Sequence, residues 1–554
     1  MTRGAALALV ALVDAALLAA LFSVVRSVVR TRPFAARGSL LAFLLLMAAA
    51  ALVLAQSPYA ASNCRVSDAA EYLAAARRFY HHGTPDLPIA GGALPTRFPI
   101  WFSVLILSPA YFLFGPELGN PIAAVTALAL LGAAAAYAAA ARIGGTAGGL
   151  TAGLLLLLNP AYRFFGREVL TDVPAAALVV VLSAAWSSEE RNRASHAASV
   201  GMLAALSAAL RPLTALVLLP FYWRLLAEKP PHRRRQALLL TLPLVVLGLA
   251  SAVYRAKTFG SPFRSGYQLW MAVPYDYASL AFSIRYLPGN LVKAAEHTAV
   301  VPYLLLLAVL YAARKPPAGS VDAGAAVLLK EYARFVALAC VPIACAYLVY
   351  FYFSSRFYLP LDAPLAVLAG ALTGLVLRDR VPQRSLFVLM LVLVCTLAVQ
   401  RAAKGPAAGG PRDDAERIAA AVPPGASVVS AINPVYLQEL LGPARTVVPL
   451  SRRVEYAGKL LAWRKIEPPP VLPEWSDHRA PFLIEGGAEE AFKDVAAESI
   501  GRLKQAMQSG KKVYLDVSAA TDEERAVFEK EFVLEPAAPA LYRLRLPPPG
   551  GGQG

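Results

Sequence analysis

The chain has 554 residues, of which 57% are hydrophobic and only 16% are charged, against roughly 25% charged in an average soluble domain. The formal net charge is +17, but the basic residues lie in short loops between apolar runs and form no nucleic-acid-binding motif, so nucleic acid is not an expected partner and the charge indicates membrane orientation. The four cysteines have no metal-ligand spacing, and neither a metal centre nor a disulfide framework is expected from them.

Apolar runs of about 20 residues recur through the first 400 positions, a length that a bilayer-spanning helix requires and a soluble core does not. The sequence therefore predicts an α-helical polytopic membrane protein with about 12 transmembrane helices. The first run contains Asp14 and lacks a small-residue cleavage site, so it is expected to be a retained helix rather than a signal peptide. The expected spans are 4–25, 39–56, 119–141, 147–160, 172–186, 197–210, 211–226, 236–253, 298–313, 333–352, 360–377 and 385–400.

Basic loops follow the first, seventh, ninth and eleventh of these spans, and all four then fall on one side, which the positive-inside rule makes the cytoplasm. The apolar segment 99–114 would break this parity if it crossed the membrane. Its Trp101, Tyr111 and flanking prolines suit a helix that lies at or dips into the outer interface. The loops 57–118 and 254–297, and everything after 400, are then expected on the periplasmic or extracellular side of the inner (plasma) membrane.

The first outer loop contains SDAAEYLAAARRFYHHG, in which Asp68, Glu71 and Tyr72 share one face of a helix. A structural interpretation is available, because Asp68 followed three residues later by Glu71 has the pattern of a capping box. A functional interpretation is equally available, because a carboxylate at the membrane surface can accept a proton from an acceptor hydroxyl. The two roles do not exclude one another.

The second outer loop, NPAYRFFGREVLTD (159–172), carries Arg163 and Arg167 ahead of Asp172. Asp172 alone fits a helix cap before Pro174, and arginines at an interface can simply extend towards water. Together they favour a binding site, because an anionic lipid phosphate at this depth needs guanidinium partners.

Two further arginines interrupt apolar segments on the outer side. Arg211 would sit at the tip of a hairpin between two short helices, and Arg356 lies in the aromatic segment YFYFSSRFYLPLDAP together with Tyr358. Each could be an interfacial anchor, but the positive-inside rule gives no reason for arginines on this side. Their recurrence favours substrate binding by Arg211, Arg356 and Tyr358. In the long loop 254–297, Arg264 and Tyr267 are candidates for substrate contact or for loop packing.

From about residue 405 the apolar runs shorten to strand length and alternate with helical patterns. This alternation predicts a soluble α/β domain over 405–546, followed by a disordered tail over 547–554. The expected strands are 426–431, 445–448, 481–485 and 512–517, and the expected helices are 412–421, 488–508 and 521–531.

The order of several short motifs resembles a known family. The motifs are SDxxEY, RFPIWFSVLILSPAYFLFG, NPxxxxxxREVLTDVP, ALRPLTALVLLP, FGSPFRSGY and SRFYLPLDAPLAVL. In this order they resemble the GT-C membrane glycosyltransferases of the family-39 type, whose relatives include protein O-mannosyltransferases and lipid A aminoarabinose transferases. The resemblance covers roughly 39–400, which implies a GT-C-like catalytic domain at 39–404 with 57–118 as its first outer loop, preceded by an additional helix and basic loop at 1–38.

The resemblance implies transfer of a sugar, with inversion, from a polyprenyl-phosphate donor to an acceptor hydroxyl on a lipid, a glycan or a protein. Asp68 matches the family's catalytic aspartate, and Glu71 matches its second acidic position at a wider spacing than the adjacent pair common in relatives. Asp172 matches the acidic residue of the second outer loop, and the arginines would face the donor phosphate. No cofactor is implied with certainty, but some relatives use a divalent metal, for which Mg²⁺ or Mn²⁺ at Asp68 and Asp172 is the candidate site.

Three other functions remain as alternatives at this stage. A transporter or lipid flippase predicts ionisable residues near the bilayer midplane and broken helices in two related halves, and no such repeat is visible. A non-catalytic membrane assembly protein predicts that Asp68 is dispensable. A polymerase or ligase of surface polysaccharide would share the lipid donor without the aspartate of the first loop.

Overall fold

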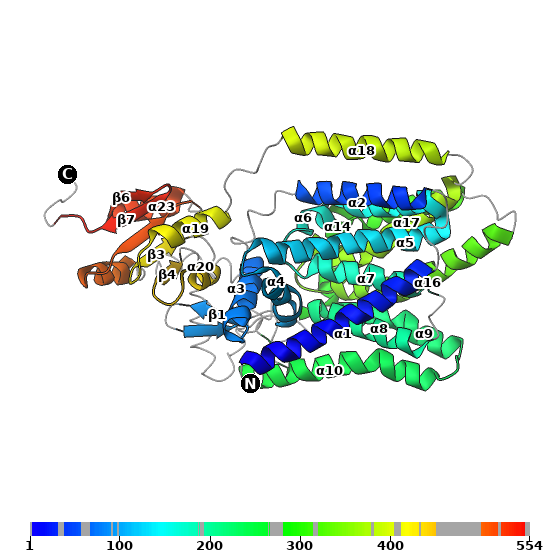
Figure 1. Cartoon of the computed structure of the whole chain (residues 1–554), viewed down its shortest axis with the longest axis horizontal. Coiled ribbons are helices and arrows are strands. Elements are labelled where there is room, and N and C mark those ends of the chain that lie inside the picture. The colour runs from blue at the N-terminus through cyan, green and yellow to red at the C-terminus, as the bar shows by residue number, and fades with distance from the viewer. Residues whose placement is uncertain are drawn as a thin grey trace.

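The computed structural model is a long bundle of helices with a small sheet beyond one end (Figure 1). It describes residues 3–30, 38–56, 67–89, 92–96, 99–186, 188, 193–263, 265, 281–313, 320–377, 382–403, 411–430, 434–449, 500–518 and 522–548. Short 3₁₀ or π turns carry the label η. The bundle elements are α1 (Arg3–Arg30), α2 (Ser39–Ala55), α3 (Ser67–His82), η2 (Ser103–Leu107), α4 (Ser108–Phe114), α5 (Gly119–Leu158), α6 (Pro160–Phe165), α7 (Asp172–Trp186), α8 (Ala194–Leu210), η4 (Pro212–Leu218), α9 (Leu219–Ala227), α10 (Arg233–Phe259), η5 (Ile284–Tyr286), α14 (Leu287–His297), α15 (Val300–Ala313), α16 (Ser320–Leu348), η6 (Ser355–Tyr358), α17 (Leu359–Leu377) and α18 (Gln383–Ala403).

Several of these helices can cross a membrane. Among the described residues, α1, α5, α10 and the continuous segment Ser355–Leu377 are long and apolar enough, and α14 with α15 makes a fifth candidate if the 68° bend between them is one broken span. Further apolar helices are shorter, namely Ser39–Ala55, Ser103–Phe114, Asp172–Trp186, Ala194–Leu210, Pro212–Ala227 and Val388–Gln400. The predicted multi-helix architecture is therefore present, and the number of twelve crossings stays a prediction.

The longest helix, α5, is a hairpin of two arms. Gly145 has φ 67° and ψ −165°, a conformation that glycine adopts without a Cβ clash. The arms lie against each other, because the Tyr162 hydroxyl just past the second arm donates to the backbone oxygen of Ala129 in the first at 2.7 Å. The arms correspond to the expected spans 119–141 and 147–160.

Helix α7 is the centre of the bundle, because every one of its residues is buried. It packs against α5, α8 and α17, and α5 and α17 approach closely. A Cβ on Gly370 of α17 would lie 2.5 Å from the backbone nitrogen of Ala152, so only glycine permits this distance. This close contact between α5 and α17 sets the relative position of the loop that follows α5 and of η6, which precedes α17.

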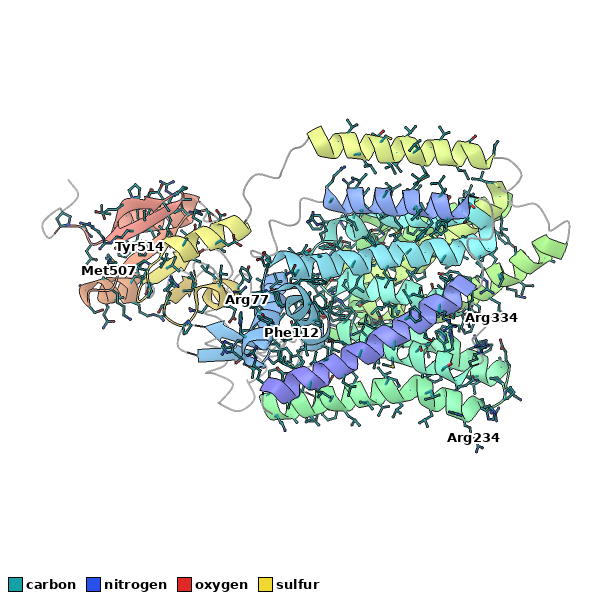
Figure 2. All side chains as sticks on the ribbon, in the orientation of Figure 1. Arg77, Phe112, Arg234, Arg334, Met507 and Tyr514 are labelled. Atoms are coloured by element: carbon teal, nitrogen blue, oxygen red, sulfur yellow. The ribbon has the colours of Figure 1, made fainter. Side chains whose placement is uncertain are left out.

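Two of the basic segments lie at one end of the bundle. Figure 2 shows Arg234 and Arg334 at the end opposite to Arg77 and Phe112. Arg234 and Arg334 belong to two of the basic segments expected on one side of the membrane, and they do lie at the same end. We call the other end, where α3 packs against η2 and α4, the α3 end. Several arginines and lysines of the other basic loops lie outside the described residues.

The segment expected at the membrane interface belongs to the α3 end. Its helix is tied to α3 by Ser103 Oγ, which donates to the backbone oxygen of Tyr72 at 3.0 Å. Trp101 Nε1 donates to Ser251 Oγ of α10 at 2.7 Å. Beyond α3, β1 (Asp86–Ile89) and β2 (Gly92–Pro95) form an antiparallel hairpin that the sequence did not predict.

The C-terminal part contains a five-stranded sheet of order β4-β3-β5-β7-β6. Strand β3 pairs in parallel with β4 and β5, whereas β7 pairs antiparallel with β5 and β6. The elements are α19 (Pro411–Ala421), β3 (Ser427–Ser430), α20 (Pro434–Leu441), β4 (Thr446–Pro449), a helical segment at 500–508, β5 (Val513–Asp516), α23 (Asp522–Glu531), β6 (Val533–Ala538) and β7 (Leu541–Arg545).

Most of these C-terminal elements were expected. Strands β3, β4 and β5 and helices α19 and α23 match the predicted segments, whereas α20, β6 and β7 were not predicted. The expected strand at 481–485, the first part of the expected helix 488–508 and most of the tail at 547–554 lie outside the described residues.

The sheet unit meets the helix bundle through α20, which packs against α3 and β1. Glu439 of α20, with its side chain 6% exposed, has its Oε2 3.9 Å from Arg78 Nη1 of α3. Arg78 Nε also donates to Asp86 Oδ1 of β1 at 2.6 Å. Burial raises the pKa of the Glu439 carboxyl to about 7, although Arg78 and Arg77 oppose the shift. A proton is therefore bound at this junction more tightly in the folded chain than in the unfolded one.

We expect this proton to make the junction stabler in acid. Between the ordinary carboxyl pKa of 4.5 and the folded value of about 7, the folded state binds more protons, so stability is fully present below pH 4.5 and is lost as the pH rises through 7. The loss is at most about 3 kcal/mol. Glu439→Gln should remove this component, so the difference in unfolding midpoint between wild type and variant should change between pH 4.5 and 8. A constant difference would contradict the assignment.

Candidate active site at the α3 end of the bundle

Charged side chains from four separate segments converge at the α3 end. Arg356 Nη2 of η6 donates to Asp68 Oδ2 of α3 at 3.0 Å, and Arg356 Nε lies 3.8 Å from Asp172 Oδ2 of α7. Asp172 Oδ1 forms an ion pair with Arg211 Nη2, at the corner between α8 and η4. We call Asp68, Asp172, Arg211 and Arg356 the ionic cluster.

Burial differs within the ionic cluster in a way that separates its members. The Asp172 side chain is 1% exposed, whereas those of Asp68, Arg211 and Arg356 are 21%, 18% and 17% exposed. Asp172 is therefore enclosed and contacts both arginines, while Asp68, Arg211 and Arg356 each keep part of the side chain exposed.

An aromatic ring completes the support of the arginines. The Cζ of Arg211 lies 4.6 Å from the centroid of the Phe357 ring, and the Cζ of Arg356 lies 5.7 Å from it. Both distances are within the range of cation–π attraction. Phe357 was not predicted as a site residue, although its position directly after Arg356 in an aromatic segment was a usable signal.

The position of Arg211 follows from the local sequence. Arg211 ends α8 with an extended backbone of φ −141° and ψ 103°, and Pro212 begins η4. A proline lacks the N–H that would continue the helix, so the chain turns back there. Thr214 stabilises the corner by donating to the backbone oxygen of Arg211 at 2.8 Å, and η4 packs on α8. The expected hairpin with Arg211 at its tip is confirmed.

Other predicted residues of α3 and η6 lie in packed positions. Glu71 is fully buried one turn after Asp68. The Tyr72 ring packs edge-on against Phe102, with centroids 4.9 Å apart. Tyr358 is buried, and its ring centroid lies 5.5 Å from that of Phe353. These side chains help to hold α3 and η6 in place around the ionic cluster.

The arginines of the second outer loop lie on a neighbouring segment. Arg163 is exposed on α6, and α6 packs against η6. Arg167 Nη1 donates to the backbone oxygen of Ala55 at the end of α2, at 3.2 Å. The structure thus brings Arg211 and Arg356 into the ionic cluster and leaves Arg163 and Arg167 beside it. Arg264 and Tyr267 lie outside the described residues.

The candidate metal ligands do not fit a divalent ion in this arrangement. Asp68 and Asp172 both contact Arg356, so the cation between the two carboxylates is a guanidinium. In the part of the chain that the structure describes, no group of three His, Cys, Asp or Glu side chains is gathered at metal-binding distance.

One buried polar pair near the site was missed by sequence reasoning. Asp362 of α17 accepts a hydrogen bond from Asn159 Nδ2 at 2.9 Å, and both residues are buried. The usable signal was an aspartate inside an apolar helix, because ionisable residues within membrane spans are rare and commonly functional.

Comparison with known proteins gives a fold but no family. No family model matches the chain, and no curated protein matches it. A crystal structure of ArnT from Cupriavidus metallidurans bound to undecaprenyl phosphate superimposes with a TM-score of 0.53 at 12% identity, over 90% of this chain and 97% of that one. ArnT in the apo state gives a TM-score of 0.50 with the same identity and coverage. The chain therefore shares the fold of these two structures.

Proposed function

We propose that this chain is a membrane glycosyltransferase that transfers a sugar, with inversion, from a polyprenyl-phosphate-linked donor to an acceptor hydroxyl. The ionic cluster is the observation that carries the proposal, because it combines an accessible carboxylate with two accessible guanidiniums at one end of an apolar bundle. The α3 end then faces the periplasm or the exterior of the inner (plasma) membrane, opposite to the end with Arg234 and Arg334.

Arg211 and Arg356 are suited to the donor phosphate. A guanidinium can donate two parallel hydrogen bonds to phosphate oxygens, and Asp172 beneath both arginines fixes their direction. A site largely withdrawn from water makes such preorganised charges more effective against the negative charge that develops as the phosphate departs. On donor binding, phosphate oxygens would replace part of the carboxylate contacts that the arginines make in this structure.

Asp68 is suited to activate the acceptor. The acceptor oxygen attacks the anomeric carbon of the sugar, and its proton passes to the Asp68 carboxylate. The bond between the anomeric carbon and the phosphate oxygen breaks, and its electron pair leaves on the polyprenyl phosphate. A single displacement of this kind inverts the anomeric configuration, and no covalent sugar–enzyme intermediate is needed.

The choice of a polyprenyl-phosphate carrier draws support from the ArnT structure, which binds undecaprenyl phosphate and has the same fold. The acceptor is a lipid, a glycan or a protein that bears a hydroxyl. The ionic cluster lies at one end of the bundle rather than along its middle, which favours chemistry at a membrane surface over transport through the membrane.

Turnover of a lipid-linked sugar tests the proposal. The purified protein, in detergent with a mixture of lipid, glycan and peptide acceptors, should release sugar from at least one polyprenyl-phosphate sugar, leaving polyprenyl phosphate. Polyprenyl-diphosphate sugars serve as the matched donor set, because a polysaccharide polymerase or ligase would use those instead. Product anomers, read by NMR, should be inverted relative to the donor.

Two outcomes would contradict the proposal. Turnover confined to diphosphate donors would support the polymerase or ligase alternative. If the protein neither turns over any donor nor binds polyprenyl phosphate, a transporter or an assembly protein would remain as the function.

A further inference from the structure

The buried pair Asn159–Asp362 joins the two segments that carry the ionic cluster. Asn159 ends α5 and begins the loop that leads through α6 to Asp172. Asp362 lies in the first turn of α17, just after η6 with Arg356. The 2.9 Å hydrogen bond between Asn159 Nδ2 and Asp362 Oδ2 therefore links the segment that leads to Asp172 directly to the segment that carries Arg356.

The Asn159 amide uses both of its ends. Its Oδ1 accepts from the backbone nitrogens of Ala161 and Tyr162 at 3.0 and 3.1 Å, which caps α6. Its Nδ2 then points to Asp362. One side chain thus sets the start of α6 and attaches it to α17.

A third helix meets at the same point. Helix α15 packs against α17, and Tyr303 of α15 donates to the backbone oxygen of Leu155 of α5 at 2.7 Å. The ends of α5, α15 and α17 are therefore held together by polar groups inside an apolar bundle. A buried carboxyl is costly unless such partners compensate it, so its presence here calls for a role that apolar packing would not supply.

We propose that Asp362 and Asn159 are positioning residues that set the distance between Arg356 and Asp172 in the ionic cluster. Neither residue needs to touch the substrate. Asp362 acts as a hydrogen-bond acceptor for Asn159, and its charge is not used in the reaction. This inference rests on the proposed glycosyl transfer for its kinetic readout, but its structural readout is independent of any substrate.

Three variants separate positioning from other roles. Asp362→Leu removes the acceptor, and Asn159→Ser keeps a cap for α6 but removes the donor that reaches Asp362. Asp362→Asn keeps an oxygen that can accept from Asn159 while removing the carboxylate. We expect Asp362→Leu and Asn159→Ser each to lower kcat about 100-fold, in line with the cost of a displacement of about 1 Å, with KM changed much less. Asp362→Asn should retain most of the wild-type kcat.

Hydrogen exchange measured by mass spectrometry gives the substrate-independent readout. Backbone amides of 159–172 and 355–358 should exchange faster in Asp362→Leu and Asn159→Ser than in wild type or Asp362→Asn. The sheet strands β3 and β5 are the internal control and should not change.

The inference would be overturned by unchanged exchange in both segments, or by an Asp362→Asn variant as inactive as Asp362→Leu, which would make the carboxylate itself essential. Faster exchange in the two disrupting variants, with no donor turned over by wild type, would support the positioning pair and contradict the proposed function. Asn159→Ser keeps the test available if Asp362→Leu does not fold.

Discussion

Replacing Asp68 by asparagine should lower sugar transfer by about 10²- to 10⁴-fold, the usual contribution of a positioned general base. The amide cannot take the acceptor proton, but its oxygen can still accept the hydrogen bond from Arg356 that the carboxylate accepts at 3.0 Å. The fold should therefore survive, because a partly exposed ion pair contributes only about 0–1 kcal/mol. Initial rates with the active donor, together with the thermal unfolding midpoint, measure both effects.

Asp414→Asn is a matched control for this variant. Asp414 pairs with Arg417 at 2.8 Å with exposures similar to those of the Asp68 pair, but it lies in the C-terminal sheet unit. We expect the sugar-transfer activity of the Asp414→Asn protein to stay at the wild-type level. Full activity in a folded Asp68→Asn protein would reduce Asp68 to a helix cap and would contradict its assignment as the general base.

Replacing Asp172 by alanine should have the largest effect on stability. Asp172 is 1% exposed and contacts both Arg211 and Arg356, so its loss leaves two neighbouring guanidiniums without their shared counter-charge. Removing one partner of a buried ion pair costs about 3–5 kcal/mol. The partial exposure of both arginines favours the lower end of that range, and the unfolding midpoint in detergent should fall accordingly.

The double variant Asp172→Ala with Arg211→Met tests the cause. If an unpaired buried charge is responsible, the second substitution should recover part of the lost stability, because it removes one of the two guanidiniums. If the double variant instead loses more unfolding free energy than the two single variants lose together, the cause is lost packing around Phe357.

The members of the ionic cluster were predictable from sequence, but their convergence was not. Asp68, Asp172, Arg211 and Arg356 could be found because each interrupts or borders an apolar segment on the side where the positive-inside rule does not require charge. The same rule selected Arg163 and Arg167 equally, because it reports the side of the membrane and not the distance between loops. Only the packing of α7, η6 and the α8–η4 corner separates the two groups.

Secondary structure outside the bundle was predictable where apolar runs were uninterrupted. Strands β3 (SVVS) and β5 (VYLD) are buried at every position, and each contains adjacent apolar residues. Strand β6 contains Pro536, which argues against a central strand, and the sheet tolerates it because β6 lies at the edge.

Helix α14 of the bundle falls in a segment that was expected to be a loop. Its polar residues interrupt the apolar pattern in the sequence, but the bend at Thr298 places the helix against α15 and α16.

The contact between α20 and α3 has a consequence for the order in which the protein is made. Glu439 leaves the ribosome long after Arg78, and at about 5–20 residues per second the delay is on the order of tens of seconds. During that time the helix that carries Asp68 has no C-terminal unit to rest on. The contacts of α20 with α3 and β1 therefore form last, and a nascent or prematurely terminated chain would carry Asp68 on a helix that still lacks them.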